Sequence, residues 1–293
     1  MPRFHLRTNS LVLLLLLAVA ACDRKVATKP PPPARPELTA AMKQQLAAHA
    51  DPDTWENLDT ARPGHRLRDP RTGIVFVRVP AGEFLMGNDA VPTEKPQHRV
   101  RLSRDYLLAE TELTIGQWQR YVREFAGNPE APVPAQPAEH PMTLSCLEAQ
   151  QFCTQFGYRL PTEAEWERAC TGGLPREQEP WANEEGMRKY AWFHRNAEMK
   201  AHPVRTREPN AFGLYDMLGN LWEWCGEDYN PVAYLKRGPL TEDPRGPSTT
   251  FDHALRGGSW FSVPPATPRT RTAGGFAEQT AFFGCRPALS ILK

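Results

Sequence analysis

Histidine and serine are the residue types in this sequence that could carry metal, acid–base or nucleophilic chemistry. The eight histidines are His5, His49, His65, His98, His140, His194, His202 and His253. None of them pairs with another at the spacing of helical metal ligands, and none lies in a Cys/His cluster, so the pattern does not indicate a zinc-type site. Ser262 lies a short way after His253, but no Gly-x-Ser-x-Gly motif surrounds it. A surface serine is therefore favoured over a hydrolytic nucleophile.

Thiols are the second reactive group. Besides Cys22, the chain holds Cys146, Cys153, Cys170, Cys225 and Cys285. An exported chain meets oxidising conditions, in which disulfides are expected. Five is an odd number, so at least one of these thiols would be left over.

The N-terminus has the pattern of an export signal. Arg3 and Arg7 precede an apolar run of eleven residues, 11–21. A membrane-spanning helix needs about 20 residues, so residues 1–21 are predicted to be a signal peptide. The run ends in Val-Ala-Ala followed by Cys22, which resembles the lipobox of bacterial lipoproteins. The alternative is an ordinary signal peptide with a chance cysteine.

A lipobox implies that the thiol of Cys22 is diacylated and becomes the lipid attachment site. We therefore expect that attached fatty acids, including palmitate, hold the protein at a membrane of the bacterial cell envelope. The domain would face the periplasm. Asp23 resembles the inner-membrane retention signal of enterobacterial lipoproteins. Inner and outer membrane both stay open, with Asp23 favouring the inner one.

Residues 22–66 are predicted to be a tether. The stretch 29–36 is rich in proline, which locks φ and removes hydrogen-bond donors, so an extended and semi-rigid spacer is expected. Apolar residues three or four apart then predict a short helix over 37–50.

The remaining residues, 67–293, are predicted to form one loop-rich α+β domain. Runs of β-branched and aromatic residues predict short strands at 74–79, 84–87, 98–102 and 106–109. Thr114 is a plausible N-cap for a helix through Phe125. Capping boxes predict two further helices: one begins after Ser145 and is stopped by Gly157, and the other begins after Thr162 and is stopped by Gly172-Gly173. Beyond Gly173 only loops, turns and short strands are expected.

Composition excludes some classes of partner. The chain has 293 residues, with 35 Lys plus Arg against 34 Asp plus Glu, a formal net charge of +1. That balance gives no electrostatic argument for binding nucleic acid. A hydrophobic share of 40% is enough for a real core.

Several ordered motifs resemble the formylglycine-generating enzyme family, also called sulfatase-modifying factors. The motifs are Phe84-x-Met86-Gly87, Arg159-Leu160-Pro161-Thr162-Glu163-Ala164-Glu165-Trp166-Glu167, Gly213-Leu214-Tyr215-Asp216-Met217-x-Gly219-Asn220-x-Trp222-Glu223-Trp224, Arg256-Gly257-Gly258-Ser259-Trp260 and Gly284-Cys285-Arg286. They run in family order from about Val75 to Arg286. The resemblance implies a C-type-lectin-like fold with small antiparallel sheets, two main helices and long loops.

The sequence departs from this family at its catalytic centre. The enzymes that make formylglycine hold copper between two cysteines just after the Arg-Gly-Gly-Ser segment, and Cu(I) prefers such thiolates. The matching positions here are Ser262 and Thr267. Hydroxyl groups cannot replace thiolates at neutral pH, so we expect neither copper nor formylglycine generation.

The resemblance also implies a calcium site. Asp216, Gly219, Leu221 and Glu223 match the family's ligands position by position. Two carboxylates and two backbone carbonyls are the hard oxygen ligands that suit Ca²⁺. The alternative is that Asp216 and Glu223 only cap loops.

Two further expectations rest on the resemblance. Cys153 and Cys285 are the favoured disulfide, because relatives bond the former position to the C-terminal region. The favoured function is a non-catalytic binding, assembly or regulatory module for an envelope protein or peptide, as in accessory proteins of type VI secretion and gliding. The alternative is a periplasmic oxidoreductase of the same superfamily that acts on a peptide or siderophore precursor.

Overall fold

The computed structural model describes residues 66–127, 130, 134–246, 252–263, 271–275 and 280–291. The chain divides into two compact units, 1–32 and 33–293, and all described residues belong to the second. The signal peptide, Cys22 and Asp23, the Pro-rich stretch, the helix expected over 37–50, and Thr267 lie outside the described residues.

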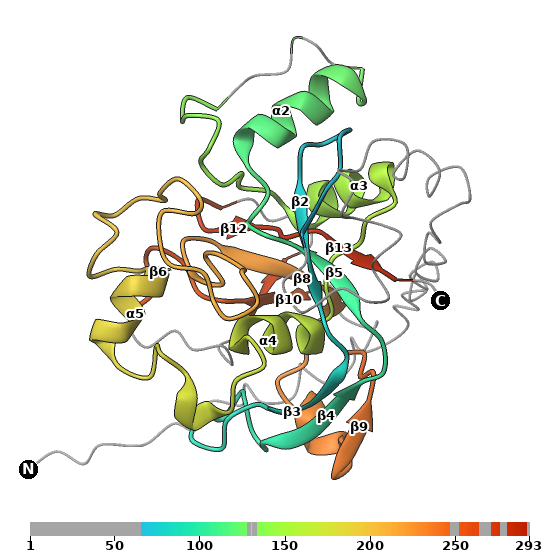
Figure 1. Cartoon of the computed structure of the whole chain (residues 1–293), viewed down its shortest axis with the longest axis vertical. Helices are drawn as coiled ribbons and strands as arrows, with labels where there is room; N and C mark the ends of the chain where they lie inside the picture. Colours follow the sequence, from blue (N-terminus) through green and yellow to red (C-terminus); the bar gives the residue numbers. More distant parts are fainter. Residues whose placement is uncertain are drawn as a thin grey trace, which may run out of the picture. The chain divides into compact units, whose positions relative to one another are not determined.

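The described residues form a mixed α/β domain of small sheets and short helices (Figure 1). The four α-helices of this part are α2 (Ile115–Glu124), α3 (Cys146–Phe156), α4 (Glu163–Thr171) and α5 (Glu184–Tyr190). Two short 3-10 helices are η1 (Arg176–Gln178) and η2 (Ala233–Lys236). The expected α+β class is therefore confirmed, with more helices than the two main ones expected.

Two four-stranded sheets and two smaller ones make up the β structure. The first has the order β1 (Arg66–Arg68), β2 (Val75–Val79), β5 (Tyr106–Ala109), β13 (Ala288–Ser290). The second has the order β11 (Arg271–Gly275), β10 (Asp252–Arg256), β8 (Trp222–Asp228), β12 (Phe283–Gly284). The smaller ones are β3 (Gly82–Met86), β4 (His98–Leu102), β9 (Leu240–Glu242), and β6 (Ala191–Trp192) with β7 (Leu218–Gly219).

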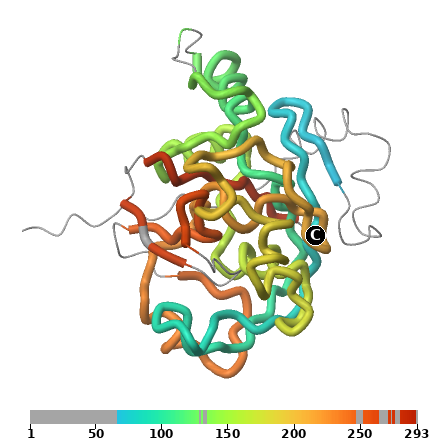
Figure 2. The backbone as a smooth tube through the Cα atoms, turned by 90° about the vertical axis from the view of Figure 1, so that its left-hand side faces the viewer, coloured from blue at the N-terminus to red at the C-terminus, as the bar shows by residue number. Residues whose placement is uncertain are grey.

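Most strand pairs are antiparallel, as expected, but three are parallel. These are β12 with β8, β4 with β9, and β6 with β7. Each parallel pair joins segments far apart in the sequence, which local patterning cannot reveal. Figure 2 shows one case, in which the teal β3 and β4 lie beside the orange β9.

Capping determines where the predicted helices begin. Thr114, Ser145 and Thr162 each accept a hydrogen bond from the backbone three residues on, and the residue there bonds back to the cap. Each such cap contributes about 1 kcal/mol to helix stability. Gly157 and Gly172 end α3 and α4 in the left-handed conformation, as the sequence predicted. Helix α5 was not expected; its N-cap is Asn183.

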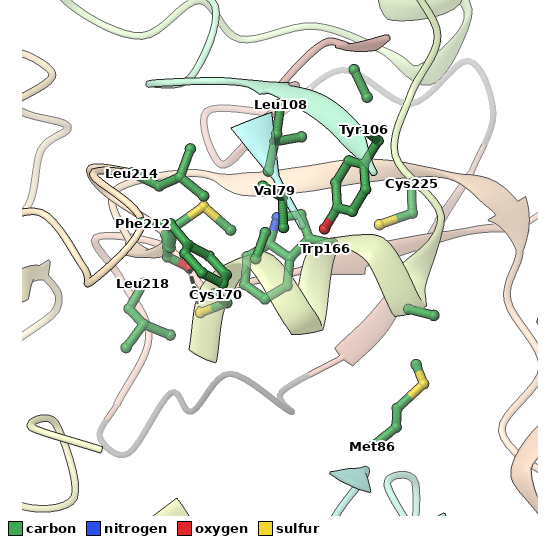
Figure 3. Close-up of a cluster of buried hydrophobic side chains, with 14 of the residues drawn as sticks. Val79, Met86, Tyr106, Leu108, Trp166, Cys170, Phe212, Leu214, Leu218 and Cys225 are labelled. Carbon is green, nitrogen blue, oxygen red and sulfur yellow. Dashed lines mark hydrogen bonds between the residues drawn. The ribbon is translucent and has the colours of Figure 1, made fainter. Parts of the chain in front are cut away.

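Two buried clusters form the core. The first surrounds Trp166 of α4, where Val79, Tyr106 and Leu108 meet it from β2 and β5 (Figure 3). The hydroxyl of Tyr106 donates to the Glu165 carbonyl at 2.5 Å, so this ring also fixes the position of α4. The second cluster lies around α3 and includes Trp224 of β8.

Within the described residues, none of the helices has the length and apolar character needed to cross a lipid bilayer.

Candidate functional site

The loop after β10 holds the position that the resemblance assigns to copper. Ser262 and Ser259 form a tight turn: the Ser262 backbone N–H donates to the Ser259 carbonyl at 2.9 Å. The Ser259 N–H donates to the Ser262 hydroxyl oxygen, also at 2.9 Å. The His194 N–H donates to the Ser262 carbonyl at 3.2 Å. The Ser262 hydroxyl therefore acts as a turn acceptor.

Gly257 explains how this loop leaves the sheet. Its φ is +95°, a conformation that favours glycine. A Cβ atom at this position would lie 3.0 Å from the Trp166 ring and 3.1 Å from the Met217 carbonyl oxygen. Gly257 of the Arg-Gly-Gly-Ser motif thus permits close packing of the loop against Trp166 of α4.

Large apolar side chains gather on the surface beside Ser262. We call Trp260, Phe261, Val263 and Phe282 the apolar patch. The Phe261 side chain is 48% exposed and that of Val263 is 70% exposed. The Phe282 ring lies 4.9 Å from the Trp260 ring and 5.7 Å from the Phe261 ring, measured between centroids. Exposed apolar patches on soluble domains are typical of interaction sites.

A cluster of three buried carboxylates lies in the interior of the domain and is joined to this loop through Asn220. Its members are Glu112, Asp216 and Glu223, each at most 2% exposed. The Glu112 carboxylate accepts from the Asn220 amide at 2.7 Å and from the Leu221 N–H at 2.9 Å. The Asp216 carboxylate accepts from the Arg205 N–H at 2.7 Å through Oδ2, while its buried Oδ1 has no hydrogen-bond partner among the described residues.

Glu223 is neutralised within the protein. Its carboxylate accepts from the Trp166 indole N–H at 2.7 Å. It also accepts from Nε of Arg286 at 2.9 Å and from Nη2 at 2.8 Å, and the Arg286 guanidinium is fully buried. The Glu223 oxygens thus accept hydrogen bonds from Trp166 of α4 and from Arg286 of the Gly-Cys-Arg motif.

Burial and mutual repulsion shift the pKa values in this cluster. Desolvation, opposed by the Arg205 hydrogen bond and Arg286 and assisted by Glu223, raises the pKa of Asp216 to about 6. Desolvation, with the charges of Asp216 and Glu223, raises the pKa of Glu112 well above its ordinary value. The charges of two guanidinium groups, Arg286 and Arg207, act on Asp216, so the three carboxylates still outnumber the cations by one, which favours a proton or a cation.

These observations test the expected calcium site. The unpartnered Asp216 oxygen and the surplus negative charge fit a cation. Glu223 does not fit, because its carboxylate already accepts from Trp166 and Arg286. Among the described residues, no three or more acidic, His or Cys side chains are grouped so as to hold a metal ion. The full ligand set of Asp216, Gly219, Leu221 and Glu223 therefore stays a prediction.

Asn220 connects the carboxylate cluster to the surface loop. It is fully buried, and its side chain donates to Glu112 at 2.7 Å. Its backbone carbonyl accepts from the Trp260 N–H at 2.8 Å, and its backbone N–H donates to the Trp192 carbonyl at 2.7 Å. Gly219 precedes it at φ +75°, where a Cβ would lie 1.9 Å from the Trp192 oxygen. The Gly-Asn pair thus positions the apolar patch relative to the cluster.

Sequence reasoning missed a second buried polar network. The carboxylate of Glu163 accepts from Arg256 at 3.0 Å and from Arg271 at 2.6 Å, and that of Glu167 accepts from Arg256 at 3.0 Å. Burial raises the pKa of Glu163, but the charges of Arg271 and Arg256 outweigh it and bring the pKa to about 2. The spacing of Glu163 and Glu167, one helical turn apart, was the available signal. The network ties α4 to the strands that flank the Ser262 loop.

The predicted disulfide is not formed in the structure. Cys153 and Cys285 are free and buried. Desolvation raises the pKa of the Cys285 thiol well above its ordinary value, and the neighbouring Cys153 adds to the shift. The Cys153 thiol therefore lies close enough to affect the pKa of Cys285. Their pairing in a disulfide stays a prediction.

Comparisons with known proteins agree with this geometry. The family model of the sulfatase-modifying factor enzyme 1-like domain matches residues 65–290. The chain is 29% identical over 276 residues to a formylglycine-generating enzyme of Streptomyces coelicolor, covering 73% of this chain and 87% of that one. It is 31% identical over 163 residues to the inactive C-alpha-formylglycine-generating enzyme 2 of Mus musculus, covering 50% of this chain and 46% of that one.

A solved structure supports the fold. PvdO from Pseudomonas aeruginosa matches with a TM-score of 0.68 and 22% identity, over 79% of this chain and 100% of that chain. At this identity the likeness shows the fold alone, and it confirms the expected formylglycine-generating-enzyme-like and lectin-like architecture.

Proposed function

Because the chain belongs to the family of sulfatase-modifying factor enzyme 1-like domains, we propose that it is a non-catalytic binding module that presents the apolar patch to a protein or peptide partner in the bacterial cell envelope. The observation that carries this proposal is the surface around Ser262. At the position of the family's first copper ligand, this chain has a hydroxyl that closes a turn, beside exposed Phe261 and Val263.

The chemistry of the patch indicates the partner. Aromatic rings with exposed edges bind apolar and aromatic side chains, and such residues are enriched at the centres of protein interfaces. The His194 ring packs 5.9 Å from the Phe261 ring, so a polar group borders the apolar surface. A partner segment with an apolar side chain next to a hydrogen-bonding group would be complementary.

The anchor and the calcium ion complete the proposal. Lipid on Cys22 would hold the domain at a membrane, facing the periplasm. Residues 22–66 would set the distance over which the domain can extend from that membrane. A cation at Asp216 would neutralise the carboxylate cluster and so stabilise the Gly219–Asn220 turn that carries the Trp260 loop. Both roles are proposed from the sequence pattern, with the unpartnered Asp216 oxygen as added support for the cation.

A second candidate function is an oxidoreductase. It is favoured by the match to the formylglycine-generating enzyme of Streptomyces coelicolor over 87% of that protein's length. Since Ser262 supplies no thiolate, such an activity would need a centre other than the family's copper pair.

Site-specific photo-cross-linking in the native host tests the binding proposal. A benzophenone amino acid replaces Val263, which is 70% exposed, or Leu235, which is 64% exposed in η2 and lies outside the patch. We expect a discrete cross-linked product from position 263 that is lost when Phe261 is changed to Ser. Equal products from both positions, or none from position 263, would count against the proposal.

A further inference from the structure

A cavity lies apart from the Ser262 loop and the carboxylate cluster. Its volume is about 470 Å³, and it is lined by residues of the β4–β5 turn, the start of α4, the segment after β9 and the end of β13. No member of the apolar patch lines it. Its size falls in the range of about 300–1,000 Å³ that is usual for ligand sites.

The walls of this cavity combine apolar and charged groups. Leu102 and Leu289 reach it from the two buried core clusters, and Ile291 lines it beside them. Leu102 is 4% and Leu289 2% exposed, so the half-buried Ile291 presents most of the apolar surface, which favours a ligand with a small apolar part.

Four acidic groups line the cavity, and three of them pair with arginines. Glu165 accepts from both Nη atoms of Arg159 at 2.6 Å. Asp105 accepts from Arg78 at 2.6 Å, and Asp243 accepts from the Ser103 N–H at 2.9 Å. Glu242, the fourth acidic group of the lining, pairs with Arg101 at 3.5 Å. Among the described residues Asp243 therefore remains the lining acid without a cationic partner, and its single charge is outnumbered by the two guanidinium groups described next.

Two guanidinium groups differ from the rest of the lining. Arg104 and Arg245 are both exposed at the cavity, and neither forms an ion pair or hydrogen bond within the part of the chain that the structure describes. Guanidinium groups bind carboxylates through paired N–H donors, and such charge-assisted bonds are stronger than neutral ones. The cavity can therefore accept an acidic group.

The edge of β13 supplies the third element. The sheet order places β13 at the end of its sheet, paired with β5 on one side. On its other side, Ala288 exchanges backbone hydrogen bonds with Arg159. Backbone groups alternate in direction along such a ladder, so those of Ser290 point the same way as those of Ala288, toward the cavity side. The described residues provide no backbone partner for them there.

We propose that this cavity binds an extended, apolar peptide segment that carries a carboxylate. The segment adds to the open edge at Ser290, places an apolar side chain against Leu102 and Ile291, and pairs its carboxylate with Arg104 and Arg245. Strand addition of this kind takes its affinity from main-chain hydrogen bonds and its specificity from the side-chain contacts. This site is independent of the apolar patch, so either can fail without the other.

Binding of short peptides to the purified chain tests the proposal. The probes are fluorescein-labelled Ser-Val-Leu-Leu with a free C-terminal carboxylate, the same peptide as its C-terminal amide, and an amidated Ser-Val-Glu-Leu. Fluorescence anisotropy gives the Kd of each. We expect the free acid to bind and its amide to bind at least about tenfold more weakly. Recovery of affinity by the Glu peptide would identify a side-chain carboxylate as the natural group.

Variants locate the binding site. The double change Arg104→Gln and Arg245→Gln should weaken binding of the free acid by at least about tenfold. Arg123→Gln, an exposed arginine of α2 outside the cavity, is the matched control and should leave the Kd unchanged. N-methylation of the central Leu amide should also abolish binding if a strand is added. Equal binding of acid and amide, an unchanged Kd in the double variant, or no binding of any peptide would overturn the proposal.

Discussion

The backbone N–H of Trp260 donates to the carbonyl oxygen of Asn220 at 2.8 Å, and this bond joins the exposed loop to the buried carboxylate cluster. The Asn220 side chain continues the connection by donating to Glu112 at 2.7 Å. Because Asn220 is fully buried, the position of the Trp260 loop depends on a group that solvent cannot replace. Buried polar residues, among them Asn220 of the Gly-Asn pair, therefore hold the apolar patch in position.

Removing the Asn220 amide should destabilise the whole domain. Asn220→Ala leaves Glu112 in the core without one of its donors, and an unsatisfied buried group costs about 1–3 kcal/mol or more when it is charged. We expect this loss in urea unfolding. Asn183→Ala, which removes only the exposed N-cap of α5, is the control and should cost about 1 kcal/mol. A smaller loss at Asn220 than at Asn183 would contradict this account.

Replacing Asp216 by Asn should stabilise the calcium-free protein at pH 7.5. The pKa of this acid is raised to about 6, so its contribution to stability falls as the pH rises from its unfolded pKa near 4 through 6. The amide removes the buried charge and can still accept from the Arg205 N–H. We expect a gain on the order of 2–3 kcal/mol at pH 7.5 and little gain at pH 4. A less stable variant at pH 7.5 would show that Asp216 is needed in its charged form.

Calcium should act through the same side chain. Added Ca²⁺ should raise the melting temperature at pH 7.5, where Asp216 is ionised, and a chelator should reverse the rise. The effect should vanish at pH 5, because the proton competes with the cation, and in the Asp216→Asn variant. Differential scanning fluorimetry measures all four conditions. A melting temperature that ignores both calcium and chelator would leave the cluster as a polar turn held by Glu112, Asn220 and Arg286.

The proposed anchor is tested at Cys22. Cys22→Ala should move the protein from the membrane fraction to the soluble periplasmic fraction and stop incorporation of labelled palmitate, since the acylated thiol is lost. Lys25→Ala, which leaves the lipobox-like junction intact, should change neither property. Membrane association that survives Cys22→Ala would mean that another segment or a partner holds the protein there.

Local signals in the sequence were enough for α2, α3 and α4, but not for α5. Capping boxes at Ser145 and Thr162 and the stop residues Gly157 and Gly172 lie within a few positions of the helix they bound, so α3 and α4 were predicted at both ends. The strands β4 and β5 were likewise predicted with their observed bounds. Short-range patterning thus located the elements of the N-terminal half of the domain, β2 to β5 and α2 to α4, and the family motifs indicated the fold.

Long-range polar contacts could not be predicted in the same way. Arg256 meets Glu163 across 93 positions of sequence, and Arg286 meets Glu223 across 63. Nothing in the spacing of these residues shows that their charges cancel in the core. The sequence alone could not show that Glu223 pairs with Arg286, because this contact forms only in the folded domain. The cavity at Arg104 and Arg245 likewise arises from four separate segments.

The most direct test of the central claim is a peptide oxidation assay on the purified protein. A peptide that carries the cysteine of a sulfatase-type sequence is incubated with the protein, Cu(I), a thiol reductant and dioxygen, and mass spectrometry follows the cysteine. The Streptomyces coelicolor relative serves as the positive control. We predict that this chain leaves the cysteine unchanged and that Ser262→Ala behaves identically. Aldehyde formation above the protein-free control would contradict the non-catalytic account, and its loss in Ser262→Ala would place the activity at the Ser262 loop.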